Sequence, residues 1–279
     1  MSRIDAHQHF WKHSQQDYGW IGPEMAVLKK DHLPNDLAPL LNSAGIDGTV
    51  AVQARQTIEE TLWLLELADQ HPLMRGVVGW VDLCGPDLLA QLERFCVHPK
   101  FRGVRHVVQD EPDDEFMLHE DFLQGLGALQ AFGLTYDILV LPRHLPIACQ
   151  VLSKFPDQPF VLDHIAKPLI KDHQIEPWAS GIRNLAAYPN ATCKVSGMVT
   201  EADWHQWQVA DLRPYLDVVF EAFGPRRIMF GSDWPVCTVA GAYAEIVDLV
   251  RDYVDTLSED EQSAVWAETA QSFYGLQMP

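Results

Sequence analysis

The chain has 279 residues, of which 47% are hydrophobic, and its formal net charge is −19 at pH 7. This length and apolar content are enough for a large buried core, whereas the negative charge disfavours a nucleic acid or an anionic membrane as a partner. No apolar run approaches the roughly 18 residues that a membrane span needs, and no basic-then-apolar leader opens the sequence, so neither a span nor a secretory signal is expected.

The five cysteines are scattered along the chain, and no two of them form a CxxC pair; they are Cys84, Cys96, Cys149, Cys193 and Cys237. Neither a disulfide framework nor a cysteine zinc site is therefore predicted. Reduced thiols in a cytoplasmic protein are the expectation. The oligomeric state is left open.

In chain order, continuous apolar runs alternate with amphipathic stretches. The runs are typical of buried strands, and they cover residues 3–10, 48–54, 76–82, 102–108, 134–140, 160–164, 191–197 and 227–233. The expected helices cover residues 35–44, 57–71, 86–95, 121–132, 144–154 and 177–187, stretches up to 223, then 239–256 and 258–273. Strands that alternate with helices in this way indicate a parallel sheet covered by helices.

Local signals mark the ends of two of these helices. Asn35 or Asp36 is expected to cap the first helix and Gly45 to stop it, while Thr57 and Glu60 match a capping box at the start of the second. Residues 11–33, between the first strand and the first helix, are aromatic and irregular. Long ordered loops of this kind are usually functional.

Eight strand–helix units in one chain predict an α/β fold, a single-domain (β/α)8 TIM barrel over residues 1–279. A doubly wound open sheet is the alternative, but no GxGxxG motif follows the first strand. Active sites of such barrels lie at the C-terminal ends of the strands. The polar residues at those ends are therefore the candidates for a site.

The first strand ends with His7 and His9. In a strand, alternate side chains point the same way, so Asp5, His7 and His9 are predicted to share one face. Two neighbouring imidazoles can hold a divalent metal or bind an oxyanion.

Strands six and eight also end in ionisable groups, His164 and Asp233. Such groups at the end of an apolar strand cost free energy on burial unless they are paired, so packing does not explain them. Alternation predicts that His164 shares an inward face with Phe160 and Leu162. By the same rule Asp233 shares one with Met229 and Gly231, and the four polar groups would form a hydrolase site at one rim.

Four motifs, on expected strands one, four, six and eight, together resemble the amidohydrolase superfamily. They are Asp5-Ala-His-Gln-His-Phe-Trp11, Arg102-Gly-Val-Arg-His106, Leu162-Asp-His-Ile-Ala-Lys-Pro168 and Phe230-Gly-Ser-Asp-Trp-Pro235. Within that superfamily they look like the lactonase branch, which includes L-fuconolactonase, L-rhamnonolactonase and pyrone-dicarboxylate lactonase. The resemblance implies a barrel enzyme that hydrolyses a cyclic ester or amide.

Departures from the superfamily pattern bear on the metal. Two-metal members carry a bridging Lys or Glu at the end of strand four and a His at the end of strand five, whereas this chain has Arg105 and Asp137 in these regions. A binuclear site is therefore not expected. One Zn²⁺ or Mn²⁺ could be held by His7, His9, His164 and Asp233. Because the lactonase branch includes metal-free members, the expectation is either no required cofactor or one divalent metal.

The expected reaction is the opening of a sugar (aldono)lactone such as L-fuconolactone or L-rhamnonolactone. Asp233 would take a proton from the attacking water, His164 would orient that water, and His7 and His9 would stabilise the oxyanion. Expected substrate contacts come from Arg105 or His106, with Arg105 favoured as the inward residue, and from Gln53, Trp80 and Trp234. Lys194 and Ser196 on strand seven could reach the same rim.

Three alternatives remain at this point. A pyrone-dicarboxylate lactonase would need several inward arginines, and only Arg105, with Arg55 or Arg143, is near the rim. A metal-dependent decarboxylase or hydratase could use the same barrel. A non-catalytic sugar-binding barrel is disfavoured by the buried carboxylate that Asp233 would contribute, and the absence of a GxSxG motif disfavours a serine hydrolase.

Overall fold

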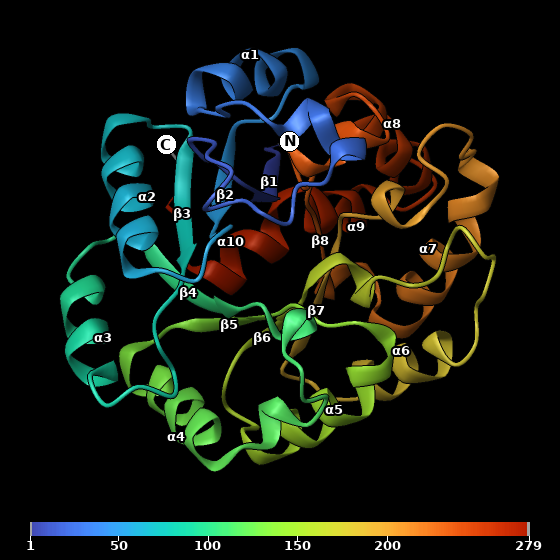
Figure 1. Cartoon of the computed structure of the whole chain (residues 1–279). Coiled ribbons are helices and arrows are strands. Elements are labelled where there is room, and N and C mark those ends of the chain that lie inside the picture. The colour runs from blue at the N-terminus through green and yellow to red at the C-terminus, as the bar shows by residue number, and fades with distance from the viewer. Residues whose placement is uncertain (1, 278–279) are drawn as a thin grey trace.

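The computed structural model describes residues 2–277. Eight parallel strands follow one another around a barrel in sequence order, with helices on the outside (Figure 1). The strands are β1 (Ile4–Gln8), β2 (Gly48–Val52), β3 (Met74–Gly79), β4 (Phe101–His106), β5 (Thr135–Ile138), β6 (Phe160–Leu162), β7 (Ala191–Val195) and β8 (Ile228–Phe230). The predicted single-domain (β/α)8 barrel is confirmed.

The barrel closes between β1 and the residues that follow β8. The Asp233 amide donates to the His7 carbonyl at 2.8 Å, and the His9 amide donates to the Trp234 carbonyl at 2.6 Å. These bonds extend the sheet ladder beyond Phe230, where β8 ends. The seam of the barrel therefore also fixes Asp233 beside the two N-terminal histidines.

The helices match the predicted pattern, with local differences at their ends. They are α1 (Pro34–Ala44), α2 (Ile58–Gln70), α3 (Leu88–Cys96), α4 (Glu120–Leu129), α5 (Leu145–Lys154), α6 (Trp178–Ala186), α7 (Val209–Phe223), α8 (Tyr243–Val254), α9 (Glu259–Ser263) and α10 (Thr269–Tyr274). A π-helical turn, Ala264–Glu268, separates α9 from α10 where one helix is predicted. This turn includes Trp266, whose ring lies 5.1 Å from that of Phe230.

The capping predictions are partly correct. Gly45 ends α1 in the left-handed conformation, with φ 70°, and Thr57 Oγ1 accepts the Glu60 amide at 3.2 Å as the N-cap of α2. The reciprocal half of the capping box is absent, because the Glu60 carboxylate instead accepts the amides of Ala54 and Arg55 at 2.9 and 2.6 Å. Glu60 thus supports the loop after β2.

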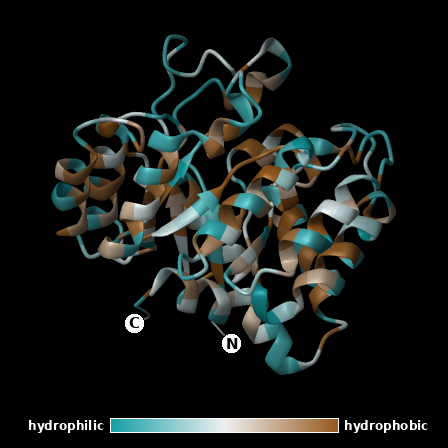
Figure 2. Ribbon diagram, turned by 90° about the horizontal axis from the view of Figure 1, so that it is seen from below, coloured by the Kyte–Doolittle hydropathy of each residue, from teal (hydrophilic) through white to brown (hydrophobic). Residues whose placement is uncertain are grey.

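The core has two layers. A large apolar cluster lies between the sheet and the surrounding helices, whose ribbons carry both hydrophobic and hydrophilic residues (Figure 2). A smaller cluster fills the lower end of the barrel, where Ile4, Val50 and Met229 meet Ala270 and Tyr274 of α10. Both chain ends lie on this side of the barrel (Figure 2), so the opposite end is free for a site.

Two predictions about strand faces are wrong. Phe160 and Leu162 of β6 face the outer cluster, while Val161 faces the barrel interior. Asp5 does not share the site-facing side of β1, because the strand has an irregular register between Asp5 and Gln8. The Asp5 carboxylate instead accepts the Tyr243 hydroxyl of α8 at 3.0 Å. Strict alternation fails where a strand bulges or ends.

Residues 11–33 form an ordered segment with one 3₁₀ turn, Pro23–Leu28, in place of a regular helix. A small buried apolar cluster within it consists of Trp11, Tyr18, Ile21 and Leu28. All five cysteines are free thiols. Among residues 2–277, no helix combines the length and apolarity that crossing a membrane requires.

Candidate active site

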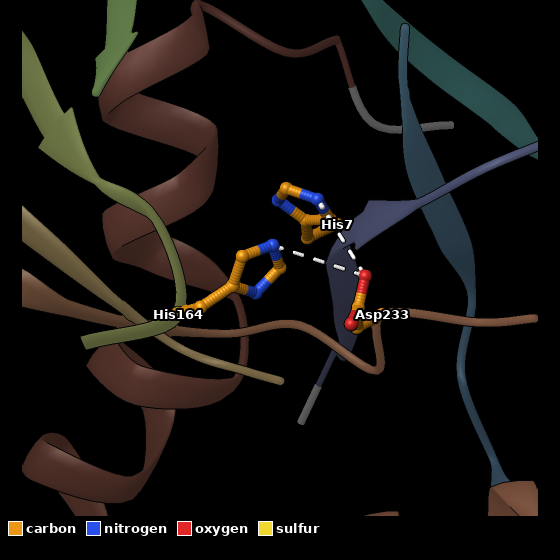
Figure 3. A group of neighbouring side chains, drawn as sticks. All are labelled: His7, His164 and Asp233. Carbon is orange, nitrogen blue, oxygen red and sulfur yellow. Dashed lines mark ion pairs between the residues drawn. The ribbon is translucent and has the colours of Figure 1, made fainter. Parts of the chain in front are cut away.

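Four polar side chains from three separate parts of the chain meet at the C-terminal rim of the barrel. Figure 3 shows His7 of β1, His164 after β6 and Asp233 after β8 pointing toward one another. Asp233 Oδ1 lies 3.4 Å from His9 Nε2, 3.8 Å from His164 Nε2 and 4.0 Å from His7 Nε2. The predicted convergence of these four residues is therefore present in the structure.

His164 reaches the site through an unusual turn. Four residues in succession, His164 to Lys167, have positive φ, at 52°, 48°, 60° and 49°. Left-handed backbone costs an L-residue roughly 1–2 kcal/mol. The turn is held by the Lys167 amide, which donates to the His164 carbonyl at 2.8 Å, and by Trp178 Nε1, which donates to the Ile165 carbonyl at 2.6 Å. Strain of this kind is typical of functional sites.

Two glycines make room for the histidines. A Cβ on Gly231 would lie 2.6 Å from His7 Cβ, and a Cβ on Gly197 would lie 2.6 Å from His164 Nδ1. Real Cβ atoms do not approach neighbours so closely, so a side chain at either position would displace a histidine. Ser196, next to Gly197, contacts His164 Nδ1 through its Oγ at 2.9 Å.

Beneath the histidines lies a fully buried charged cluster, which we call the sub-site cluster: Arg105, Asp137, Asp163, Lys194 and Tyr274. Lys194 Nζ lies 2.5 Å from Asp137 and 3.0 Å from Asp163. Arg105 contacts Asp163 at 3.1 Å, and the Tyr274 hydroxyl donates to Asp137 at 2.8 Å. Paired and hydrogen-bonded, these charges can be buried without the penalty that isolated ions carry.

The sub-site cluster touches His7 from below. His7 Nδ1 lies 3.1 Å from Lys194 Nζ and 3.3 Å from Asp163 Oδ1, so it can accept from the first or donate to the second. His9 Nδ1 lies 2.8 Å from the Val52 carbonyl, which can only accept, so we assign the proton of neutral His9 to Nδ1. His9 Nε2 is then an acceptor, and His7 Nε2, 3.2 Å away, can donate to it.

Burial and neighbouring charges set the protonation states. Burial raises the pKa of Asp233, but His164, His9 and His7 outweigh it, so the pKa lies below its usual range. Burial lowers the pKa of His164 to about 4, against the opposing charges of Asp233 and Asp163. The pKa of His7 is also well below its usual range, chiefly because of burial. At neutral pH the site therefore holds the Asp233 carboxylate beside two neutral imidazoles, those of His7 and His164.

The donor set fits one divalent ion. His7, His164 and Asp233 each offer a ligand atom within 4.8 Å of the other two. Two imidazole nitrogens and one carboxylate oxygen are ligand types that Zn²⁺ and Mn²⁺ accept. His9 lies outside this group of three, although its Nε2 is close to both His7 and Asp233. As a ligand, His7 Nε2 needs a free lone pair, and donation of Nδ1–H to Asp163 would provide it.

A cavity of about 610 Å³ opens above these residues. His9, Arg105, His164 and Asp233 are at its lining, and Arg105 rather than His106 points inward, as favoured from the sequence. Further lining residues come from the 11–33 segment and from the loops after β2, β4, β6 and β7; they include Trp11, Asp17, Trp20, Arg55, Gln109, Lys167, Glu201 and Trp204. This volume suits a small cyclic substrate.

Four of the residues predicted to bind substrate lie outside the cavity lining. His106 stacks on Phe116 and lies 2.6 Å from Glu111. Trp80 donates through Nε1 to His106 Nδ1 at 3.4 Å, so both face the outer layer. Gln53 is buried and donates to the Arg105 carbonyl, and Trp234 packs on Phe10. The structure therefore contradicts these four predictions. For His106 the reason is alternation, because its neighbour Arg105 faces inward.

The sequence interpretation missed Asp163 and gave no role to Glu201, Gln109 or Trp204. Asp163 directly precedes His164 and, like it, follows an apolar strand, so the same signal applied to it. Glu201 and Trp204 lie in an irregular segment after β7, where no periodicity indicates which side chains turn inward. Only the path of the folded loop reveals them.

Comparison with known sequences places these features in a family. The amidohydrolase family profile matches residues 4–276, nearly the whole chain. The chain belongs to the amidohydrolase family. Among curated relatives, this amidohydrolase is 43% identical over 288 residues to the L-fucono-1,5-lactonase of Burkholderia multivorans, covering 99% of this chain and 97% of that one. It is 37% identical over 281 residues to the L-fucono-1,5-lactonase of Burkholderia ambifaria, with the same coverage.

A solved structure agrees with the sequence relatives. The crystal structure of an amidohydrolase from Burkholderia multivorans, described with bound zinc, superposes on this amidohydrolase with a TM-score of 0.96 and 43% identity. The match covers 99% of this chain and 100% of that one. A bound zinc in that protein agrees with the His–Asp donor set described above.

Proposed function

We propose that this amidohydrolase opens a sugar lactone, an L-fucono-1,5-lactone or a similar aldonolactone, by hydrolysis of the ring ester. One observation carries the proposal: a carboxylate held ionised, Asp233, lies with His9 and His164 at the floor of a cavity that suits a monosaccharide lactone, and the buried His7 lies 4.0 Å from it. Relatives at 37–43% identity over nearly the whole chain are L-fucono-1,5-lactonases.

The charges of the cavity favour a neutral substrate. Within the described chain, every lysine and arginine of the lining has a carboxylate partner: Arg55 with Asp17 at 2.9 Å, Arg105 with Asp163 at 3.1 Å, and Lys167 with Glu201 at 4.0 Å. A dicarboxylate such as pyrone dicarboxylate would need unpaired arginines for its two anionic groups. An uncharged polyhydroxy lactone needs none.

In the proposed mechanism Asp233 accepts a proton from the water that attacks the lactone carbonyl, and His164 orients that water. His7 Nε2–H and the Arg105 guanidinium, 3.3 Å apart, donate to the developing oxyanion. His9 differs from its predicted role, because its assigned Nε2 lone pair accepts rather than donates. Asp233 then returns its proton to the ring oxygen as the ester bond breaks, which leaves the open hydroxy acid.

A divalent metal held by His7, His164 and Asp233 would lower the pKa of a water and polarise the carbonyl. The residues fit this role. Because a lactone is an activated ester and His7 and Arg105 already supply donors, we expect hydrolysis to continue without the ion. What the chain itself determines is the arrangement of the Asp233, His164, His7 and Arg105 side chains.

The test is a panel of lactones, including L-fucono-1,5-lactone, followed by proton release with a pH indicator. The wild type, as purified and after removal of metal with a chelator, is compared with Asp233→Asn. We expect the variant to lose at least about 10³-fold in kcat/KM while its thermal unfolding stays unchanged. Near-normal hydrolysis by Asp233→Asn would refute the role of Asp233, and no turnover of any lactone by the wild type would refute the function.

A further inference from the structure

One wall of the cavity combines an ammonium, a carboxylate and an indole next to the reacting groups. Lys167 comes from the loop after β6, and Glu201 and Trp204 come from the loop after β7. Lys167 Nζ and Glu201 Oε1 are 4.0 Å apart, and the two side chains are 22% and 24% exposed. This wall adjoins His164 and Asp233, which line the same cavity.

The wall is rigidly built. Lys167 belongs to the left-handed turn that positions His164, through the bond from its amide to the His164 carbonyl. The Lys171 amide donates to the Glu201 carbonyl at 3.0 Å, which joins the two loops. Trp204 Nε1 donates to the Thr200 carbonyl at 2.8 Å, which fixes the indole. These bonds fix the backbone positions from which Lys167 and Glu201 reach the cavity.

The ion pair of this wall leaves hydrogen-bonding capacity free. An ammonium has three donors and a carboxylate about four acceptor sites, and a separation of 4.0 Å is beyond a direct hydrogen bond. The pair on the other side of the cavity is different, because Arg55 Nη2 and Asp17 Oδ1 are 2.9 Å apart and satisfy each other. Of the two ion pairs of a lysine or arginine whose partners both line the described cavity, the Lys167–Glu201 pair is therefore the one with an open donor and an open acceptor.

A purely structural role explains this wall less well. The two loops are already joined by the Lys171 backbone bond, and a loose, partly exposed ion pair contributes little stability. A sugar hydroxyl, in contrast, both donates and accepts, so it can bridge an ammonium and a carboxylate that stand apart. Indoles next to such groups commonly pack on sugar rings.

We propose that Lys167 and Glu201 bind the ring hydroxyls of the lactone and make the enzyme selective for hydroxylated over unsubstituted lactones. The proposal rests on the proposed function, since it names the specificity residues of that same site. Trp204 forms the apolar part of the same cavity wall.

The test compares two six-membered lactones: L-fucono-1,5-lactone, which carries hydroxyls, and δ-valerolactone, which has none. Lys167→Met and Glu201→Met keep the length of each side chain and remove its polar head. We expect each to lower kcat/KM for the sugar lactone about 10- to 100-fold, because a charged group stops binding a hydroxyl. The same variants should change kcat/KM for δ-valerolactone less than about 2-fold, so the preference for the sugar collapses.

Lys171→Met is the matched control, because this exposed residue contributes only its backbone amide to the wall. It should leave both substrates unaffected. Glu201→Gln, which keeps hydrogen-bonding atoms, should retain more of the sugar preference than Glu201→Met. Equal losses on both lactones would show a structural role and overturn the proposal, as would an unchanged preference. Failure of the proposed function is distinguishable, because then the wild type itself opens neither lactone.

Discussion

Asp233 and His164 illustrate how individual residues acquire their chemistry from burial. Both are almost completely enclosed, and their lowered pKa values keep Asp233 ionised and His164 neutral at ordinary pH. Each neutral imidazole lowers the cost of the buried carboxylate by presenting a polar group to it. The site is therefore charged correctly before substrate arrives.

The pH dependence of catalysis follows from these two shifts. Both pKa values are lowered, so the form that the proposed mechanism requires, ionised Asp233 with neutral His164, persists as the pH falls until His164 protonates near pH 4. We expect kcat/KM for the lactone to be level from about pH 8 to about pH 5 and to fall below that. Initial rates across this range, with folding checked by circular dichroism at each pH, measure it. An acid limb centred near 6.5 would show that His164 is not shifted.

Lys194 is the residue on which the sub-site cluster depends. Its ammonium is wholly buried and lies within 3.1 Å of Asp137, Asp163 and His7. Burial opposes the ionisation of Asp163, but Lys194, His7 and Arg105 hold the pKa of that carboxyl below its usual range. The pairing of Lys194 therefore contributes to the stability of the protein as well as to the position of His7.

Lys194→Met should destabilise the protein by about 3–5 kcal/mol, because it leaves Asp137 and Asp163 buried without their cation. Urea unfolding followed by fluorescence measures the loss. The control is Arg226→Met, which breaks an exposed pair with Asp260 at 3.9 Å and should change stability by no more than the error of the measurement. A similar small effect for Lys194→Met would contradict the buried-pair interpretation.

At the scale of elements, the loops after the strands carry the site, and helices support the loops. Glu60 of α2 accepts the Ala54 and Arg55 amides and also lies 3.4 Å from the Tyr18 hydroxyl of the 11–33 segment. It thereby links a helix, the loop after β2 and the segment over the cavity. Burial raises the pKa of Glu60 to about 7.

Glu60 should make stability depend on pH. A folded-state pKa raised from 4.5 to about 7 means that its stabilising contribution is complete below about pH 4.5 and is lost as the pH rises through 7. Glu60→Gln removes this loss. The stability of the variant relative to the wild type should therefore increase as the pH rises from 5 to about 8. Thermal unfolding at both pH values tests it. Glu59→Gln, at the exposed neighbouring position, should show no such difference.

At the scale of the whole molecule, the chain carries a net charge of −19, while the lysine and arginine side chains that line the cavity are paired with carboxylates. A neutral lactone does not feel this field, whereas the hydroxy acid produced from it is an anion. The field therefore favours release of the product over its rebinding. Solubility and product release follow from the same surface.

Ionic strength should separate the two effects. We expect kcat/KM for a neutral sugar lactone to change less than about 2-fold between 10 and about 300 mM salt, because no charge is attracted or repelled. Inhibition by the corresponding aldonate should be weaker at low salt, where repulsion is unscreened. A lactone rate that changes strongly with salt would instead indicate a charged substrate.

The barrel and most of the floor of the candidate site are predictable from the sequence alone. Alternating apolar runs and amphipathic helices leave few folds other than eight parallel strands, and ionisable groups at strand ends identified His7, His9, His164 and Asp233 because packing cannot explain them. Alternation indicated that only one of Arg105 and His106 faces inward and Arg105 was favoured, but the folded structure was needed to choose between them. These signals are local, because burying an apolar run is favourable and burying an unpaired ionisable group is costly in any barrel.

Tertiary structure decided what lies next to what. The four-residue left-handed turn after β6 brings His164 into the site although Phe160 and Leu162, predicted to share its face, point outward, and the bulge in β1 moves Asp5 away from His7. Lys194, Asp163 and Tyr274 come from segments far apart in the sequence, and only barrel closure and the C-terminal helix brought them beneath His7. The loops that supply Glu201 and Trp204 have no periodicity, so their inward side chains depend on contacts that no local pattern encodes.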